Sequence, residues 1–460
     1  MKKALFKGLA LGGLALSLAS PFSAVAGGPD IPESLLLEAK SSLDRGTNFL
    51  LDRQGEDGSW LKQPSVTALC AVALRNSNTK QNEPQREAAV EKARKYILAH
   101  VRPDGSITPD DGSYVNYTTS ICLAALAIIN NPADKEVMRN ARHFLIGEQI
   151  TEERLAFLKK KFEAYKKAID ILMKEQDNPF LAGLDIDRKR LEKVYKKYKD
   201  YASKDLSKNN PFYGGIGYGS GGPTVPDLSN TSWALEALYL TDNLDSESGG
   251  GTPETAKKSA LAWKRAVDFL RKVQRIPESA DASWVVTDEK KFDGGFVYQP
   301  GYSKVNDKAA KNGGKMPKNK LGYPDTPGLR SYGTMTYAGL KSMIYAKLKK
   351  DDFRVKAATE WAGKHYTLDE NPEMGPEGHY YYLHLFAKAH AVLGEDYVVT
   401  PDGTKHNWRI DLIKKLLDLQ KGKGEWINDK SGRWWESIPE LGTAYALIAM
   451  EIALGSKIAE

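Results

Sequence analysis

Two kinds of helix are predicted to alternate along the 460-residue chain. The first kind is amphipathic, with Lys and Arg on one face, as in the segment from Glu254 to Gln274. The second kind carries small and apolar residues almost all round, as in the run that follows Thr67. An amphipathic helix buries one stripe, whereas a helix that is apolar on every side is buried completely. The pattern therefore predicts outer helices that alternate with inner ones.

The loop between an outer helix and the next inner helix also recurs. The outer helix ends near Gln, a loop rich in Gly, Asp and aromatic residues follows, and the inner helix then begins. Six copies can be traced, the fifth of them degenerate, and four inner helices carry an aligned Thr: Thr67, Thr119, Thr231 and Thr443. An open stack of repeats needs polar capping repeats at its ends, and the sequence shows no obvious one. We therefore expect an all-α (α/α)6 toroid, a closed double ring of six helical hairpins.

The recurring loops predict a stabilising role. In the first copy the motif comprises Gln54, the pair Asp57-Gly58 and Trp60. An Asp-Gly pair allows a turn with positive φ between the helices. The aromatic residue can pack over the helix ends, and the Gln side chain can bond backbone groups that are left free there.

Two insertions interrupt the repeat within a toroid domain that spans residues 27–460. Residues 150–208 are expected to form a charged helical hairpin packed on the ring, either as a lid or partner surface or as a solvated decoration. Residues 302–329 are rich in Lys, Gly and Pro and are expected to form a loop. Residues 1–26 have a basic start, a short apolar run and the cleavage site Ala24-Val25-Ala26, which together predict a signal peptide. We therefore expect a periplasmic or secreted protein.

Charge and cysteine content narrow the possible partners. The formal net charge is +7, and loss of Lys2, Lys3 and Lys7 with the signal peptide leaves about +4. This mild charge, together with export, argues against nucleic acid as a partner. No later apolar run is long enough to predict a transmembrane segment in the mature chain. Cys70 and Cys122 hold equivalent places on neighbouring inner helices, so they are either two buried thiols or a disulfide.

Two loops carry a resemblance to a known family. The segment Gln54-x-x-Asp57-Gly58-Ser59-Trp60 resembles the QW motif of squalene-hopene and oxidosqualene cyclases. The segment Asp293-Gly294-Gly295-Phe296 resembles loops of protein prenyltransferase β subunits. The chain is thus similar to the terpene cyclase and protein prenyltransferase superfamily, and in particular to exported prenyltransferase/squalene-oxidase repeat proteins. The resemblance implies the α/α-toroid fold and an isoprenoid or other apolar small molecule as partner, but a fold does not fix a function.

The catalytic motifs of that superfamily are missing. Class II cyclases use an Asp in a D-x-D-D run as the acid, whereas Asp185-Ile186-Asp187 is followed by Arg188. Prenyltransferases hold zinc with Asp, Cys and His, and the matching stretch Ser331-Tyr332-Gly333-Thr334 offers neither Asp nor Cys. We therefore expect no metal and no cofactor, and the catalytic residues stay unassigned.

The starts of the inner helices are the candidate ligand-binding region. Aromatic side chains at these positions would either line a cavity for an apolar ligand or fill the centre of the ring. The candidate ligand-binding residues are Tyr117, Asp227, Asn230, Trp233, Tyr332, His379, Tyr381, His384, Trp435 and Glu436.

Four functions remain open from the sequence. The first is a binding protein for an apolar or isoprenoid ligand, and the second is a divergent terpene cyclase or prenyltransferase-like enzyme. The third is a carbohydrate-active α/α-toroid enzyme, which would need paired carboxylates across the cavity. The fourth is a structural interaction module, which would show a filled centre and a large exposed apolar patch.

Overall fold

The structure is a computed structural model of the chain. It describes residues 31–77, 81–174, 209–219, 225–279, 292–305 and 329–456. The predicted signal peptide lies outside the described residues, as do most of the 302–329 insertion and the second half of the 150–208 insertion.

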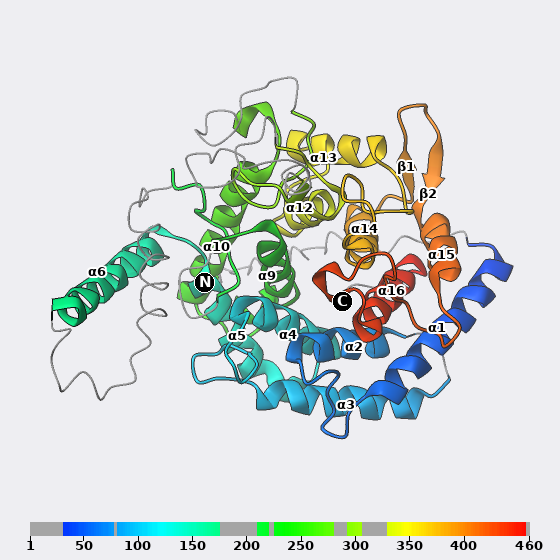
Figure 1. Cartoon of the computed structure of the whole chain (residues 1–460), viewed down its shortest axis with the longest axis horizontal. Coiled ribbons are helices and arrows are strands. Elements are labelled where there is room, and N and C mark those ends of the chain that lie inside the picture. Colours follow the sequence, from blue (N-terminus) through cyan, green and yellow to red (C-terminus); the bar gives the residue numbers. More distant parts are fainter. Residues whose placement is uncertain are drawn as a thin grey trace, which may run out of the picture.

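Inner helices surround one axis and close into a ring (Figure 1). Along the chain each inner helix contacts the next, and the last one, α16, contacts the first, α2. Among the described residues the inner helices are α2 (Pro64–Asn76), α4 (Val115–Ile129), α9 (Leu228–Leu240), α12 (Gly333–Tyr345), α14 (His379–Leu393) and α16 (Pro439–Ala453). Nearly every residue of these helices is buried, as the apolar pattern predicts.

Outer helices alternate with the inner ones and pack against them from outside (Figure 1). They are α1 (Glu33–Arg53), α3 (Glu83–Ala99), α5 (Lys135–Glu148), α10 (Pro253–Val273), α13 (Phe353–Lys364) and α15 (Trp408–Leu419). Short 3-10 helices are η1 (Pro132–Asp134), η2 (Asp242–Asp245), η3 (Pro277–Ser279) and η5 (Arg433–Trp435). The mostly helical prediction is confirmed, although a small antiparallel hairpin of β1 (Tyr397–Val399) and β2 (Lys405–Asn407) was not expected.

The Gln at the end of an outer helix joins neighbouring repeats. The side-chain amide of Gln54 donates to the carbonyl of Gly58 in its own loop, at 2.9 Å, and to that of Ala89 in the next outer helix, at 2.8 Å. Equivalent pairs of bonds run from Gln149 to Gly214 and Ala262, from Gln274 to Gly294 and Arg354, and from Gln420 to Gly424 and Ser42. The predicted bonds of the Gln side chain to backbone groups are confirmed.

In every described inner helix except α14, a Thr bonds the loop that precedes the helix. The Thr67 hydroxyl accepts a 3.0 Å hydrogen bond from the backbone N–H of Trp60. The same bond to a loop N–H is accepted by Thr119, Thr231, Thr336 and Thr443. Thr336 extends the series to the fourth copy, where the sequence alignment had not placed a Thr.

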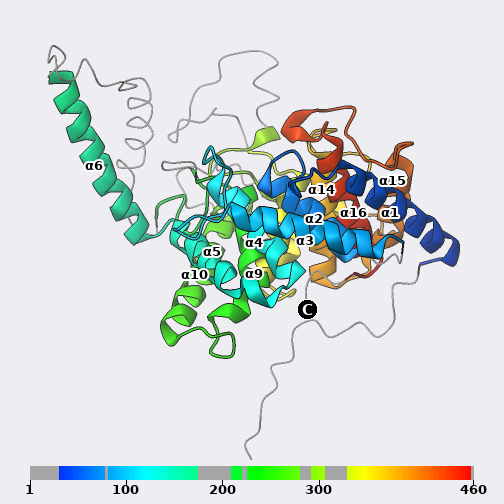
Figure 2. The same ribbon diagram turned by 90° about the horizontal axis from the view of Figure 1, so that it is seen from below.

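The insertion after α5 begins with a helix, as predicted. This helix, α6 (Glu152–Lys174), extends away from the ring in both views (Figures 1 and 2). The expectation that the insertion packs on the ring is therefore wrong for α6, whose Lys- and Glu-rich surface suits it to solvent. The second helix of the predicted hairpin lies outside the described residues.

The two cysteines are free thiols. Cys70 and Cys122 are both fully buried, and burial raises the pKa of each. Of the two alternatives left open by the sequence, two buried thiols is the correct one. No helix in the described part of the chain is both long and apolar enough to cross a membrane.

Candidate ligand-binding site

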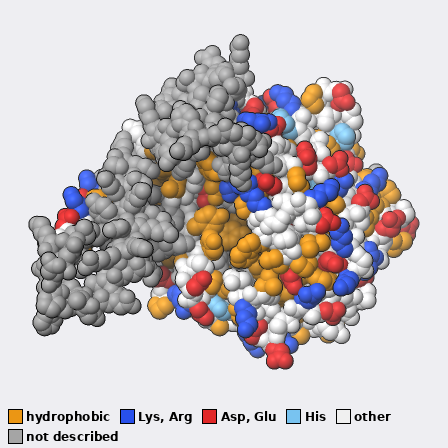
Figure 3. Space-filling view, viewed as in Figure 1, with side chains coloured by type: hydrophobic (Ala, Val, Ile, Leu, Met, Phe, Trp, Pro, Cys, Tyr) orange, Lys and Arg blue, Asp and Glu red, His pale blue; other side chains and the backbone are white. Residues whose placement is uncertain are grey.

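The inner helices all begin on one side of the ring, which we call the mouth. The loops that precede them lie along the upper side of the ring in Figure 2, the side that faces the viewer in Figure 1. Contacts between helix starts agree with this direction, since the hydroxyls of Ser229 in α9 and Tyr381 in α14 lie 3.1 Å apart. Figure 3 shows hydrophobic side chains gathered around a hollow near the middle of this face.

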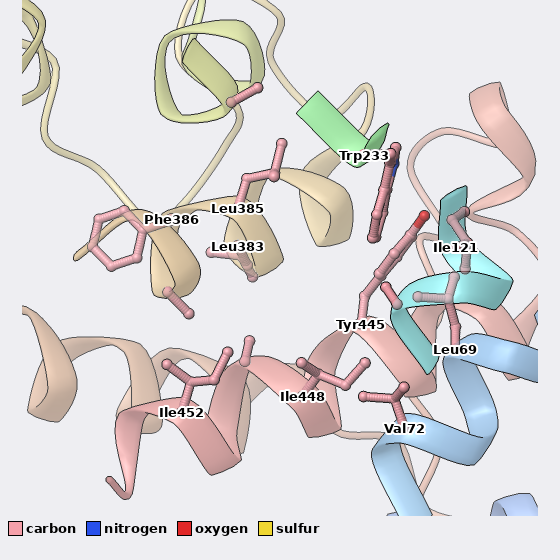
Figure 4. Packing of buried hydrophobic residues seen from close by; sticks show 14 of the residues in the cluster. Leu69, Val72, Ile121, Trp233, Leu383, Leu385, Phe386, Tyr445, Ile448 and Ile452 are labelled. Carbon is pink, nitrogen blue, oxygen red and sulfur yellow. The ribbon is translucent and has the colours of Figure 1, made fainter. Parts of the chain in front are cut away.

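Aromatic side chains from four inner helices meet below the mouth. The Trp233 ring lies parallel to that of Tyr381, with an interplanar angle of 10° and centroids 6.1 Å apart. Tyr117 meets Trp233 edge-on at 6.4 Å, and His384 lies 5.6 Å from it. Tyr445 completes the group, 5.1 Å from His384, and Figure 4 shows it pointing toward Trp233. We call these five residues the aromatic well.

The aromatic well is buried at depth and partly exposed at the mouth. Trp233 and His384 are buried, with 2% and 0% of their surfaces exposed, whereas Tyr117 and Tyr381 are partly exposed. Partly exposed aromatic rings stacked on buried ones offer flat apolar surface to a ligand. Four of the predicted ligand-binding residues are thus brought together: Tyr117, Trp233, Tyr381 and His384.

Asp227 is a buried carboxylate at the mouth. It is the N-cap of α9 and accepts hydrogen bonds from the backbone N–H of Asn230, at 2.9 Å, and from its side-chain amide, at 2.7 Å. Burial raises the pKa of Asp227 to about 6, against the opposing effects of these bonds and of the nearby Lys304 ammonium. The predicted pair of Asp227 and Asn230 is therefore a capping unit whose acid titrates near neutrality.

Glu436 is a second buried carboxylate with a raised pKa. It accepts hydrogen bonds of 2.8 Å from the backbone N–H of Tyr381 and from the side chain of Asn428. Burial raises the pKa of Glu436 to about 7 even though these bonds favour the charged form. Glu436 thereby ties the loop before α16 to the start of α14.

Of the remaining predicted residues, Tyr332 interacts with Asp227 and with Tyr381 of the aromatic well, whereas no interaction joins His379 or Trp435 to the well among the described contacts. Tyr332 is buried at the N-cap of α12. The Nε2 atom of His379 lies 2.9 Å from the carbonyl oxygen of Leu368, and burial lowers its pKa, so it has a local structural partner. Trp435 is exposed in the loop before α16, with φ of +68°.

A buried ion triad lies one turn below the aromatic well and was missed in the sequence. The Nζ atom of Lys341 lies 2.5 Å from a carboxylate oxygen of Glu236, and Lys388 donates to the other oxygen of the same carboxylate. All three side chains are buried. Burial acts to raise the pKa of Glu236, but the two ammonium groups outweigh it and hold the pKa at about 2.

Tyr445 was also missed, although the repeat contains its signal. It follows Thr443 by two residues, as Trp233 follows Thr231, and Leu69 and Ile121 hold the same position after their Thr. Figure 4 shows these four side chains converging between the inner helices. The position two residues after the repeated Thr therefore faces the ring axis.

No group of three His, Cys, Asp or Glu side chains within the described ranges is arranged to hold a metal ion.

Comparison with known proteins finds similarity in structure alone. No family model matches the chain, and no curated protein matches its sequence. A variant of the type II terpene cyclase MstE from Scytonema, in complex with merosterolic acid A, is similar with 13% identity and a TM-score of 0.45 over 93% of this chain and 100% of that one. A protein from Actinoplanes is similar with 13% identity and a TM-score of 0.43, over 90% of this chain and 99% of that one.

Proposed function

We propose that this protein is an exported α/α-toroid that binds an apolar or isoprenoid molecule at the aromatic well. The ligand lies against Tyr117 and Tyr381 at the mouth, above the buried ring of Trp233. The protein acts without the acid and zinc motifs of the superfamily that its loops resemble.

The observation that carries this proposal is the stack of Tyr381 on Trp233. A ring that serves only to fill the core is normally buried on both faces, whereas Tyr381 is partly exposed while its neighbour is buried. Exposed apolar surface that gathers around a hollow, as in Figure 3, marks an interaction site more often than scattered exposure does. Several tyrosines that converge there supply area at a small cost in side-chain entropy.

A second candidate function is proton-transfer catalysis on such a ligand. It is favoured by Asp227 and Glu436, whose pKa values of about 6 and 7 suit a general acid or base near neutral pH. If the protein is such an enzyme, Asp227→Asn abolishes turnover of the recovered ligand and leaves its binding intact. If Asp227 serves only as the cap of α9, the variant loses stability and no turnover is seen in either protein.

The test of the proposed function is native mass spectrometry of the protein purified from the cells that make it, followed by lipid extraction. We expect an adduct that dissociates on unfolding and is recovered as an apolar molecule in the extract. A protein without any adduct, whose mass and melting temperature are unchanged by added polyprenyl lipids, would exclude the proposed function. Sequencing the mature N-terminus from the same preparation tests export, which predicts a start at Gly27.

A further inference from the structure

The interior of the ring holds an excess of positive charge. Glu236, Lys341 and Lys388 have side-chain exposures of 1%, 0% and 5%, and they bring two ammonium groups to one carboxylate. With both lysines protonated the group carries a net charge of +1 in a place without solvent, and burial lowers the pKa of Lys341 to about 8. A buried charge that is not fully compensated costs several kcal/mol unless another group offsets it.

Among the described residues the remaining inner helices carry no acid at the equivalent position, and the buried Glu451 of α16, three residues beyond Ile448, has a pKa that burial raises well above its usual value. Glu236 and Lys341 each lie five residues after the repeated Thr of their helices, and the same position is Val72 in α2, Ala124 in α4 and Ile448 in α16. Two other titratable groups interact electrostatically with the triad. His384 interacts with both ammonium groups, and the phenol of Tyr345 interacts with Glu236. Neither supplies a negative charge, since burial raises the pKa of the Tyr345 phenol.

Unsatisfied hydrogen-bonding groups lie directly between the triad and the mouth. Both ring nitrogens of His384 and the indole nitrogen of Trp233 are buried and have no hydrogen-bond partner. The centroid of the Trp233 ring lies 5.5 Å from the Lys341 ammonium and 5.3 Å from that of Lys388. Buried polar groups are bonded in the great majority of cases, so this group of donors beside an excess charge indicates a missing acceptor.

From this arrangement we infer that the ligand is an amphiphile with an anionic end, a carboxylate or a phosphate monoester, which binds beside the packed rings of Trp233 and His384 when Tyr381 moves aside. This inference rests on the proposed function and specifies its ligand class. The indole N–H and a protonated ring nitrogen of His384 donate to the anion, and the excess ammonium charge of the triad offsets its charge. The apolar chain extends toward the mouth along Tyr117 and Tyr381.

Tyr381 is the side chain that admits the anionic end. It covers Trp233 and is held at its hydroxyl by the 3.1 Å contact with Ser229. Rotation of one partly exposed tyrosine opens the buried donors to the mouth without a change in the ring of helices. An anion that enters here replaces its hydration shell with fixed donors and an unpaired positive charge.

The test compares ligands with the same chain and different ends by isothermal titration calorimetry. Decanol, decanoate and decyl phosphate share a ten-carbon chain, and inorganic phosphate supplies the anion alone. We expect at least one of the two anionic amphiphiles to bind ten-fold or more tightly than decanol, and inorganic phosphate to bind weakly. Equal affinity for all three amphiphiles would overturn this inference and leave the proposed function standing. If inorganic phosphate binds as tightly as decyl phosphate, the site binds a free anion and not an amphiphile, which overturns this inference. If no amphiphile binds, both proposals are contradicted.

Two variants assign the anion preference to these residues. Lys341→Met removes the excess charge and leaves the neutral pair of Glu236 and Lys388, so we expect a folded protein that binds decanol normally and loses the ten-fold preference. Trp233→Phe keeps an aromatic ring and removes the N–H donor, which lowers the preference several-fold and provides an independent result if Lys341→Met fails to fold. The control is Lys349→Met, an exposed lysine beyond the end of the same helix. A preference that survives both Lys341→Met and Trp233→Phe would contradict the assignment.

Discussion

The side chain of Gln420 bonds the backbone of Ser42 across 378 residues of sequence. The Gln420 amide donates a 2.9 Å hydrogen bond to the Ser42 carbonyl, and the Ser42 hydroxyl donates a 2.8 Å hydrogen bond to the amide oxygen of Gln420. The same contact links α1 to α3, α5 to α10 and α10 to α13, and here it links the last outer helix, α15, to the first, α1. The closing contact of the ring is therefore made by the repeated motif itself and needs no special device.

The first prediction concerns this closing contact. Gln420→Ala removes the amide that satisfies the carbonyls of Ser42 and Gly424, and we expect the free energy of unfolding to fall by about 2 kcal/mol. Urea denaturation measures the change. Gln85→Ala, at an exposed position in α3, is the control and should alter the free energy by less than about 0.5 kcal/mol. Equal effects of the two substitutions would mean that the closing contact contributes nothing.

The second prediction concerns two glycines of one loop. Gly424 has φ of +91°, and a Cβ there would lie 2.5 Å from the carbonyl oxygen of Arg45, whereas a Cβ at Gly422 meets nothing within 4 Å. Gly424→Ala should therefore lower the free energy of unfolding by about 2 kcal/mol or more, because it adds a backbone clash to an unfavourable φ. Gly422→Ala should be neutral or slightly stabilising. Thermal melting of the two variants side by side decides this, and a neutral Gly424→Ala would show that the loop can move away from α1.

The repeat explains how far the sequence predicts this structure. Period and residue type identify inner and outer helices, and the loop motif identifies the bonds of Gln54 and its equivalents, because these depend on local spacing. The aligned Thr also sets which side chains face the axis, so Tyr445 could have been found by counting from Thr443. Residue type alone does not single out Tyr445, whereas its position within the repeat does.

The ion triad could not be predicted in the same way. Lys341 and Lys388 are charged residues on predicted inner helices, and a lysine is rarely buried unless it is paired. Their partner, Glu236, is more than 100 residues away from either. The packing of the successive inner helices α9, α12 and α14 brings the three side chains together, and the shared repeat position of Glu236 and Lys341 does not by itself show that they pair with Lys388. His379, conversely, is a polar aromatic residue at the start of an inner helix, as the prediction required, but its Nε2 atom lies beside the Leu368 carbonyl oxygen.

The third prediction concerns pH. The pKa of Glu436 is raised from 4.5 to about 7, so the folded state holds this proton more tightly than the unfolded state does. The stabilisation is complete below about pH 4.5 and is lost as the pH rises toward about 7. Glu436→Gln removes this dependence, and the wild-type protein should lose on the order of 3 kcal/mol more than the variant between about pH 4 and pH 8. Urea denaturation at several pH values gives the two curves, with the exposed Glu370→Gln as control; parallel curves for wild type and Glu436→Gln would contradict the raised pKa.

The fourth prediction concerns backbone strain at the mouth. Trp434 and Trp435 are consecutive residues with φ of +57° and +68°, a conformation that costs a non-glycine residue about 1 kcal/mol or more. Both Trp435→Gly and Trp435→Ala remove the exposed ring, but only glycine relieves the strain. We expect the glycine variant to be more stable than the alanine variant by about 1 kcal/mol, as measured by urea denaturation. Equal stability of the two variants would show that the backbone at residue 435 is not strained.

The central claim is that the aromatic well binds an apolar chain, and an equilibrium titration tests it most directly. Farnesol is added to the wild-type protein, to Tyr381→Ala and to the control Tyr397→Ala, whose tyrosine is exposed on β1, beyond the C-terminal end of α14. Binding is followed by the change in tryptophan fluorescence and confirmed by calorimetry. We predict saturable binding with one site in the wild type and in Tyr397→Ala, and an affinity at least ten-fold lower in Tyr381→Ala. Absence of saturable binding in the wild type, or equal affinity in all three proteins, would contradict the account.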